Sequence, residues 1–352
     1  MPSRRSRRFH SGPTKRSSGA ARRRASPDRL STGAPVRPTA ARRCRDRLRR
    51  VTDHVLTGAA HETFLSVGDV TFRVASDDPR LASAPEGPLE SFCAGQGRAD
   101  VDIRARWTDT PAECRGDVLF DSGGAWQLLR SNSEFLFTFR SRAAGLVPYK
   151  TARFNPAFTS GDVRLHRRHF DQQSSDAVYP LEYPLDELLM IHLLSQGRGV
   201  EIHGCGLLDA AGRGYVFAGQ SGAGKSTMAR LWVNQPGVTL LSDERVVLRT
   251  DRDRITIHGT PWHGDAMLVS PLSGELAGVF LLNHSASHAV VPTGGSRAAA
   301  QLLACSFIPF YSAAAVDRTM RAIEQVIRGV PCHDLWFAPD VSVIDVLTRH
   351  MD

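Results

Sequence analysis

One glycine-rich segment restricts the fold of this 352-residue chain more than any other part of its sequence. The apolar run before the segment predicts a strand and the residues after it predict a helix, which is the context that such a loop requires. A chain of this composition has little chance of containing the G-x-x-x-x-G-K-[ST] pattern at random. The alternative interpretation of the segment is an ordinary glycine-rich turn. The pattern is G-x-x-x-x-G-K-[ST], formed by Gly219, Gln220, Ser221, Gly222, Ala223, Gly224, Lys225, Ser226 and Thr227.

The residue types of this P-loop indicate its chemistry. Glycines tolerate positive φ, so backbone N–H groups can curl around phosphate oxygens. Lys225 would contact the β- and γ-phosphates, and the Ser226 hydroxyl would ligate Mg²⁺. The N-terminus of the following helix favours the same anion. The segment therefore predicts binding of ATP together with Mg²⁺.

Two acids follow the next expected strand. Asp243 lies eighteen residues after Lys225, and Glu244 comes directly after it. An apolar strand that ends in acids just beyond the P-loop helix has the form of a Walker B segment. One acid could bind Mg²⁺ directly or through water, and the other could take a proton from an attacking hydroxyl. A pair of ordinary surface acids is the alternative.

Three histidines and one further acid are weaker candidates. His203 lies before the P-loop, whereas His258, His263 and Asp265 lie in a polar, glycine-flanked segment after the acid pair. The composition of that segment is typical of an active-site loop. A lone histidine is more often a packing residue than a catalytic one, so both interpretations of each histidine stay open.

The charge of the chain is unevenly distributed. Of 44 Lys and Arg residues, 17 lie in residues 1–50, which contain only two of the 36 acids. We expect these residues to be a disordered basic tail, because Arg, Ser, Pro and Gly cannot bury enough surface to order it. Contact with nucleic acid or an anionic surface, and a role as a transit peptide, are the alternatives. The rest of the chain is mildly acidic, so nucleic acid is not the expected partner.

The sequence after the tail divides near residue 180. Residues 51–180 contain short alternating runs between turn residues, which predicts a β-rich domain of antiparallel strands. In residues 181–352 predicted strands alternate with helices such as Leu185–Leu194, which indicates an α/β domain. The expected fold class is α+β overall. No apolar run is long enough to span a membrane, and six scattered cysteines favour a reducing, cytoplasmic location over a disulfide scaffold or a structural zinc site.

The order of these motifs resembles the bacterial HPr serine kinase/phosphorylase family. His203-Gly204 precedes the P-loop by about sixteen residues, and the acid pair follows on the very next strand. The resemblance covers about residues 180–352 and implies a P-loop kinase core of the architecture found in ATP-dependent phosphoenolpyruvate carboxykinases. It implies that Asp243 is the catalytic base towards a serine hydroxyl, that Glu244 lies near the metal, and that His203 is the active-site histidine.

The sequence also departs from that family. The family's Glu-Ile-Arg-Gly segment corresponds to Thr256-Ile257-His258-Gly259, which has no acid at position 256, and Asp265 is a candidate replacement. The β-rich first half is unlike the amino-terminal domain of the HPr kinases. Relatives of this type include kinases that phosphorylate a serine of a lasso-type precursor peptide. A peptide of that kind is as plausible a substrate here as HPr.

We therefore expect an ATP-dependent kinase, with ATP and Mg²⁺ as cofactors, that phosphorylates a serine of a small protein or peptide. A regulatory module that binds ATP without transferring phosphate is the first alternative, because it needs the P-loop but no base. A nucleic-acid-dependent NTPase is a weaker alternative that the basic tail alone suggests. The sequence leaves a homo-oligomer open and does not identify the acceptor.

Overall fold

The structure is a computed structural model that describes residues 61–110, 114–141, 145, 147–252 and 254–351. All of these belong to one compact unit, Thr39–Asp352. The expected basic tail, residues 1–50, lies outside the described residues. Within them, the chain is mixed α and β and forms two mixed sheets, so the expected α+β class is confirmed at this level.

The first sheet contains eight strands within the described residues, in the order β1-β2-β3-β8-β7-β6-β5-β4. Its strands are β1 (His61–Val67), β2 (Val70–Ser76), β3 (Val101–Thr108), β4 (Asp117–Asp121), β5 (Trp126–Ser131), β6 (Glu134–Phe139), β7 (Lys150–Phe154) and β8 (Ser160–His166). Short 3-10 helices cover Pro79–Leu81, Gly87–Phe92 and Arg167–His169. The sequence predicted antiparallel strands here, and that prediction is wrong for one strand. Strand β3 runs parallel to both β2 and β8. Alternation identifies a half-buried strand but carries no information about the direction of its neighbour.

The second sheet has nine strands in the part of the chain that the structure describes. They are β9 (Gly199–Leu208), β10 (Gly214–Ala218), β11 (Thr239–Ser242), β12 (Arg245–Asp251), β13 (Arg254–His258), β14 (Ser273–His284), β15 (Ala289–Pro292), β16 (Ser306–Phe307) and β17 (Cys332–Phe337). The pairing of β10, β9, β12, β13 and β14 closes into a ring, because β14 also pairs with β10. Three strands, β10, β14 and β17, run parallel.

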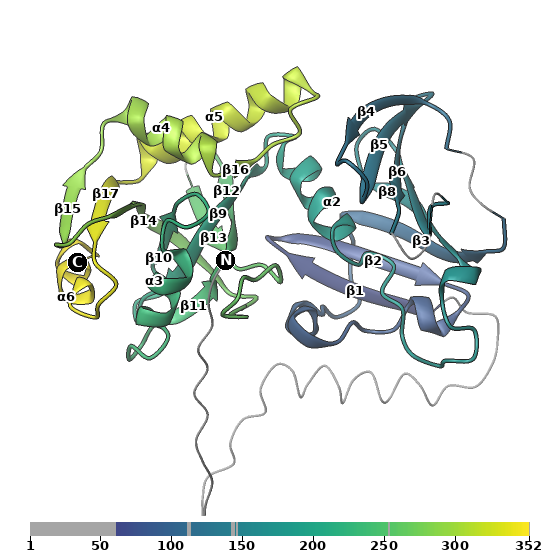
Figure 1. Ribbon diagram of the computed structural model, residues 1–352, viewed down its shortest axis with the longest axis horizontal. Helices are drawn as coiled ribbons and strands as arrows, with labels where there is room; N and C mark the ends of the chain where they lie inside the picture. The colour runs from purple at the N-terminus through teal and green to yellow at the C-terminus, as the bar shows by residue number, and fades with distance from the viewer. Residues whose placement is uncertain (1–60, 111–113, 142–144, 146, 253, 352) are drawn as a thin grey trace, which may run out of the picture. The chain divides into compact units, whose positions relative to one another are not determined.

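Helices cover both faces of this second sheet (Figure 1). Apolar side chains of α4 (Gly295–Ala304) and α5 (Ala313–Gly329) pack in one core, and those of α3 (Lys225–Trp232) and α6 (Val343–Met351) pack in another. Helix α2 (Leu185–Leu194) belongs instead to the core of the first sheet, and all ten of its residues are buried. Among the described residues, no helix has both the length and the apolar content that crossing a membrane requires.

Candidate active site

The P-loop connects a buried strand to a helix. Strand β10 ends at Ala218 and α3 begins at Lys225, so the glycine-rich residues lie where the sequence placed them. Gly222 and Gly224 have φ values of 82° and 100°, in the left-handed region that favours glycine. A Cβ atom on Gly224 would also lie 2.7 Å from Cζ of Phe337. Both the backbone conformation and the packing therefore require glycine at position 224.

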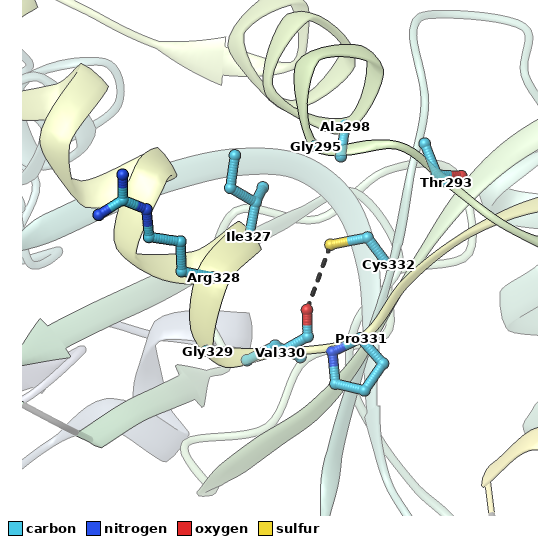
Figure 2. A pocket seen from close by; sticks show the side chains of 9 residues that line it. All are labelled: Thr293, Gly295, Ala298, Ile327, Arg328, Gly329, Val330, Pro331 and Cys332. Carbon is cyan, nitrogen blue, oxygen red and sulfur yellow. Dashed lines mark hydrogen bonds between the residues drawn. The ribbon is translucent and has the colours of Figure 1, made fainter.

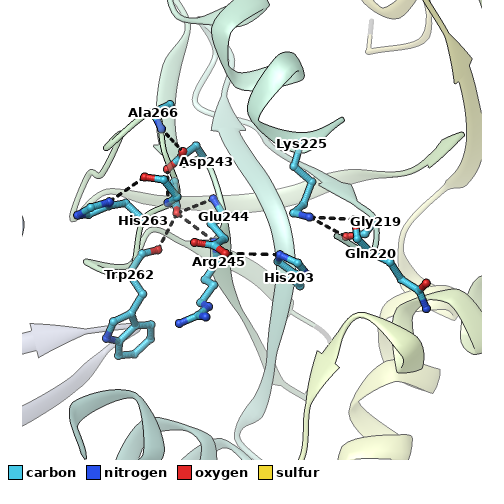
Figure 3. Close-up of polar contacts among 12 residues, drawn as sticks. His203, Gly219, Gln220, Lys225, Asp243, Glu244, Arg245, Trp262, His263 and Ala266 are labelled. Atoms are coloured by element: carbon cyan, nitrogen blue, oxygen red, sulfur yellow. Dashed lines mark hydrogen bonds and ion pairs between the residues drawn. The ribbon is translucent and has the colours of Figure 1, made fainter. Parts of the chain in front are cut away.

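Lys225 lies inside the curl of this loop. Its side chain is buried, and Nζ donates hydrogen bonds to the carbonyl oxygens of Gly219 at 3.0 Å and Gln220 at 3.1 Å (Figure 3). Burial lowers the pKa of Lys225. The first amides of α3 have no partner within the helix and point out of its N-terminus, where the helix dipole favours an anion. A phosphate at this position would receive these N–H groups and the ammonium together.

Strand β9 joins the P-loop to the acid pair. It pairs with β10 and also with β11 and β12, between which Asp243 and Glu244 lie. The amide of Gly219 donates to the carbonyl of His203 at 3.4 Å, and the amide of Gly204 donates to the carbonyl of Glu244 at 2.9 Å. Residues from three separate sequence segments therefore meet around one strand.

His203, Lys225 and Glu244 form what we call the phosphate-side cluster. The His203 Nε2 and Glu244 Oε1 atoms are 3.7 Å apart, and the Glu244 side chain is 31% exposed. Burial and the positive charges of Lys225 and Arg245 lower the pKa of His203 to about 4. The imidazole is therefore neutral at neutral pH, and its contact with Glu244 is polar rather than an ion pair.

Asp243 differs sharply from its neighbour Glu244. It is fully buried, and its two carboxylate oxygens accept hydrogen bonds from the amides of Gly264 at 3.0 Å and Ala266 at 2.9 Å. These bonds place the exposed residue Asp265 in a short loop over the carboxylate. In this state Asp243 holds the loop in place, and an acceptor hydroxyl would reach it only after that loop moves.

The two histidines of the polar segment separate in the structure. His263 belongs to the loop over Asp243, where its Nδ1 lies 2.9 Å from the carbonyl oxygen of Gly264. His258 is buried and contacts the Thr256 hydroxyl at 2.8 Å and Asp69 at 3.6 Å. Among the described contacts of His258, none involves the P-loop or the acid pair. Of the two, only His263 therefore lies beside a predicted site residue.

A second charged group next to this site was not expected from the sequence. We call Glu187 of α2, Glu201 of β9 and Arg245 of β12 the sealed cluster. Arg245 Nη1 and Glu187 Oε1 form an ion pair at 2.5 Å, and Glu201 is fully buried. Within the described residues, neither carboxylate oxygen of Glu201 accepts a hydrogen bond. Burial and the nearby Glu187 raise the pKa of Glu201 well above its usual range.

No motif marks the sealed cluster in the sequence. The one local signal is that Glu201 and His203 are two residues apart in an apolar strand, and so share a face. A helix with two acids, such as α2, is normally amphipathic, whereas α2 buries both Asp186 and Glu187. That burial follows from the packing of distant segments.

The donor atoms at the site suit a metal ion that arrives with phosphate. Mg²⁺ is usually held by one or two carboxylates, substrate phosphates and water. Ser226 is the second residue of α3, beside the loop, and Glu244 offers a partly exposed carboxylate. Among the described residues, no three His, Cys, Asp or Glu side chains form a complete metal site by themselves. Ser226 and Glu244 therefore fit a metal ion bound jointly with a nucleotide.

A separate hollow of about 360 Å³ lies between the end of α5 and the start of β17 (Figure 2). Cys332, which lines it, is the first residue of β17, and β17 runs parallel to β10. The hollow therefore lies at the strand ends opposite the P-loop. Burial raises the pKa of the Cys332 thiol to about 11, so this thiol stays protonated and unreactive at neutral pH.

A scan against protein-family models finds no match for the sequence, and a search of curated proteins finds none either.

Proposed function

We propose that this protein binds ATP with Mg²⁺ at the P-loop and transfers the γ-phosphoryl group to a serine hydroxyl of a small protein or peptide. One observation carries the proposal: His203, in the middle of β9, lies between the strand that leads into the P-loop and the strand that follows the acid pair, and Lys225 is close enough to affect its charge. An anion site beside an accessible carboxylate is what phosphoryl transfer requires. The carboxykinase-like P-loop kinase core is part of the same proposal.

Each residue has a proposed role. Lys225 and the amides at the start of α3 bind the β- and γ-phosphates and neutralise their charge. Ser226 and Glu244 hold Mg²⁺, which adds positive charge against the transferred group. As the bond between the γ-phosphorus and the ADP oxygen breaks, the serine oxygen bonds to phosphorus. The serine proton then passes to a carboxylate, which we assign to Asp243.

The assignment of the base depends on the loop 264–266. Its amides now occupy the carboxylate of Asp243, so binding of the acceptor would have to displace them. A neutral His203 beside Glu244 can donate or accept a hydrogen bond without adding charge. We therefore place His203 next to the transferred phosphoryl group as a hydrogen-bonding residue.

A regulatory module that binds ATP without transfer is the second candidate. The burial of Asp243 favours this candidate, because ATP binding without transfer needs no accessible base. The two candidates differ in one product: only the kinase forms ADP and a phosphorylated acceptor. A protein that binds ATP but yields neither product with any serine-containing acceptor would support the regulatory role.

Nucleotide binding is tested with Lys225→Ala. Loss of a charge-assisted contact to phosphate should weaken Mg-ATP binding by roughly 10- to 100-fold, measured by titration calorimetry. Arg230→Ala is the matched control, because Arg230 is an exposed cation in the last turn of the same helix. Equal affinities of wild type and Lys225→Ala would refute the P-loop assignment.

Phosphoryl transfer is tested with ATP labelled in the γ-phosphate. The protein is incubated with candidate acceptor peptides and with the same peptides carrying Ser→Ala. We expect label on the serine peptide alone, and none with Lys225→Ala. Label on the alanine peptide would show that another group accepts the phosphoryl.

A further inference from the structure

Two aromatic side chains end the strands next to the P-loop strand. His284 is the last residue of β14 and Phe337 is the last of β17, and they are register partners. Their rings are stacked, with centroids 6.3 Å apart and planes at 21°. Because β14 runs parallel to β10, both side chains lie at the edge from which the P-loop leaves.

His284 contacts the peptide unit between Gly222 and Ala223 of the P-loop. Its Nε2 lies 2.7 Å from the carbonyl oxygen of Gly222, so an Nε2–H group donates to it. The N–H of the same peptide unit, on Ala223, donates to the carbonyl of Gln220 at 3.0 Å. A peptide unit is planar and holds its C=O and N–H in opposite directions. Hydrogen bonds at both ends therefore prevent this unit from rotating.

Phe337 fixes the next part of the loop. Its buried ring occupies the space that a side chain at position 224 would need. Gly222 and Gly224, the two loop residues with left-handed φ, are therefore each held by one member of the same strand-end pair. The contacts within the loop itself do not explain why each of these two glycines meets one of the two aromatic residues.

We propose that His284 is a positioning residue of the P-loop, with Phe337 as the support for its ring. The His284 bond holds the Gly222–Ala223 peptide in the geometry that turns the remaining loop amides toward phosphate before the nucleotide arrives. A loop that is ordered in advance loses less conformational entropy on binding, which raises affinity. The choice of ligand rests on the proposed function, whereas the effect on the loop does not.

Two substitutions separate the hydrogen bond from the ring. His284→Gln keeps an N–H donor, and His284→Phe keeps a ring against Phe337 without a donor. We expect His284→Phe to bind Mg-ATP roughly 3- to 10-fold more weakly and His284→Gln to stay within about 2-fold of wild type. His288→Gln is the control, because His288 lies near the same edge and contacts Ser342 at 2.8 Å, Asp340 at 3.3 Å and the Ala338 amide at 3.3 Å rather than the P-loop.

Amide hydrogen exchange without nucleotide gives a second readout. The Ala223 amide should exchange several-fold faster in His284→Phe than in wild type or His284→Gln, at unchanged global stability. Unchanged affinity together with unchanged Ala223 exchange in His284→Phe would overturn the proposal. If wild type fails to bind ATP, the proposed function fails, and the exchange rates still decide whether His284 positions the loop.

Discussion

The phosphate-side cluster and the sealed cluster each contain glutamate and a basic side chain, but they differ in how those charges are compensated. His203 and Glu201 lie on one face of β9, only two residues apart. Beside His203, the Glu244 carboxylate is partly exposed, and the buried ammonium of Lys225 is bonded to carbonyl oxygens of its own loop rather than to an acid. At Glu201 the nearby cation Arg245 is already paired with Glu187 inside the protein.

This difference shows how function and stability divide along one strand. A buried charge is costly unless a partner compensates it. In the sealed cluster Arg245 is paired with Glu187, and the raised pKa of Glu201 favours its neutral form. Among the described residues, the hydrogen bonds of Lys225 go to carbonyl oxygens of its own loop rather than to an acid. A dianionic phosphate would therefore improve the electrostatics of the phosphate-side cluster. Nothing comparable would change in the sealed cluster.

The largest expected effect concerns turnover at the acid pair. If Asp243 is the base, Asp243→Asn should lower single-turnover phosphoryl transfer by about 10²- to 10⁴-fold, with little change in ATP affinity. Glu244→Gln should instead weaken Mg-ATP binding, and raised Mg²⁺ or Mn²⁺ should partly restore it. Rates and affinities of both variants reveal the assignment. The opposite pattern, with binding lost in Asp243→Asn, would exchange the two roles.

The next largest effect concerns the stability that Arg245 provides. Arg245→Met keeps most of the side-chain volume but leaves Glu187 buried without its cation. Breaking a buried pair in this way should cost about 3–5 kcal/mol in the free energy of unfolding, measured by urea denaturation. Arg254→Met, on an exposed part of β13, is the control and should change it by less than about 0.5 kcal/mol. A small loss for Arg245→Met would show that the cluster is hydrated.

Local sequence patterns predicted many of the elements. The strand before the P-loop, the helix after it and helix Leu185–Leu194 were all expected and are found there. Short-range periodicity sets these elements, so the sequence is enough to find them. The hairpin β12–β13 was missed, because Arg245–Asp251 carries charged residues at both ends that resemble a loop.

The places of the glycine-rich loop, between a strand and a helix, and of the acid pair, after a strand, could be predicted because each is a contiguous sequence motif. The loop over Asp243 and the sealed cluster could not be found this way, since they depend on contacts between distant segments. Glu187 and Arg245, which are 58 residues apart, meet only after α2 has packed against β9, the neighbour of β12 in the sheet. No local rule distinguishes a buried acid of this kind from a surface acid before the tertiary structure is known.

A smaller effect should appear in the pH dependence of stability beside the sealed cluster. Burial raises the pKa of Asp186 to about 7. A carboxyl whose pKa is raised by folding stabilises the protein at low pH, and this contribution is lost as pH rises from about 4 to about 7. Asp186→Asn should remove that loss and gain roughly 2–4 kcal/mol relative to wild type at pH 8.

Denaturation of wild type and Asp186→Asn at pH 4, 6 and 8 measures this difference. Glu201→Gln should change stability in the same direction, because burial also raises the pKa of Glu201. Parallel stability curves for wild type and both variants would contradict a sealed, poorly hydrated cluster.

The smallest expected effect concerns His203 of the phosphate-side cluster. Because burial and two cations lower its pKa to about 4, its imidazole should stay neutral from pH 5 to 8. Its carbon-bound proton resonances should therefore titrate near pH 4, and the pH profile of kcat/KM should show no inflection from His203 between pH 5 and 8.

Folding lowers the pKa of His203, so the histidine contributes stability above its unfolded pKa of about 6.5, and that stability is lost as pH falls toward 4. Lys225→Ala removes one of the two cations and should move the titration upward, as should Mg-ATP, because its phosphates offset the lysine charge. A His203 titration near neutral pH in the free protein would show that the phosphate-side cluster is far more hydrated than its burial indicates.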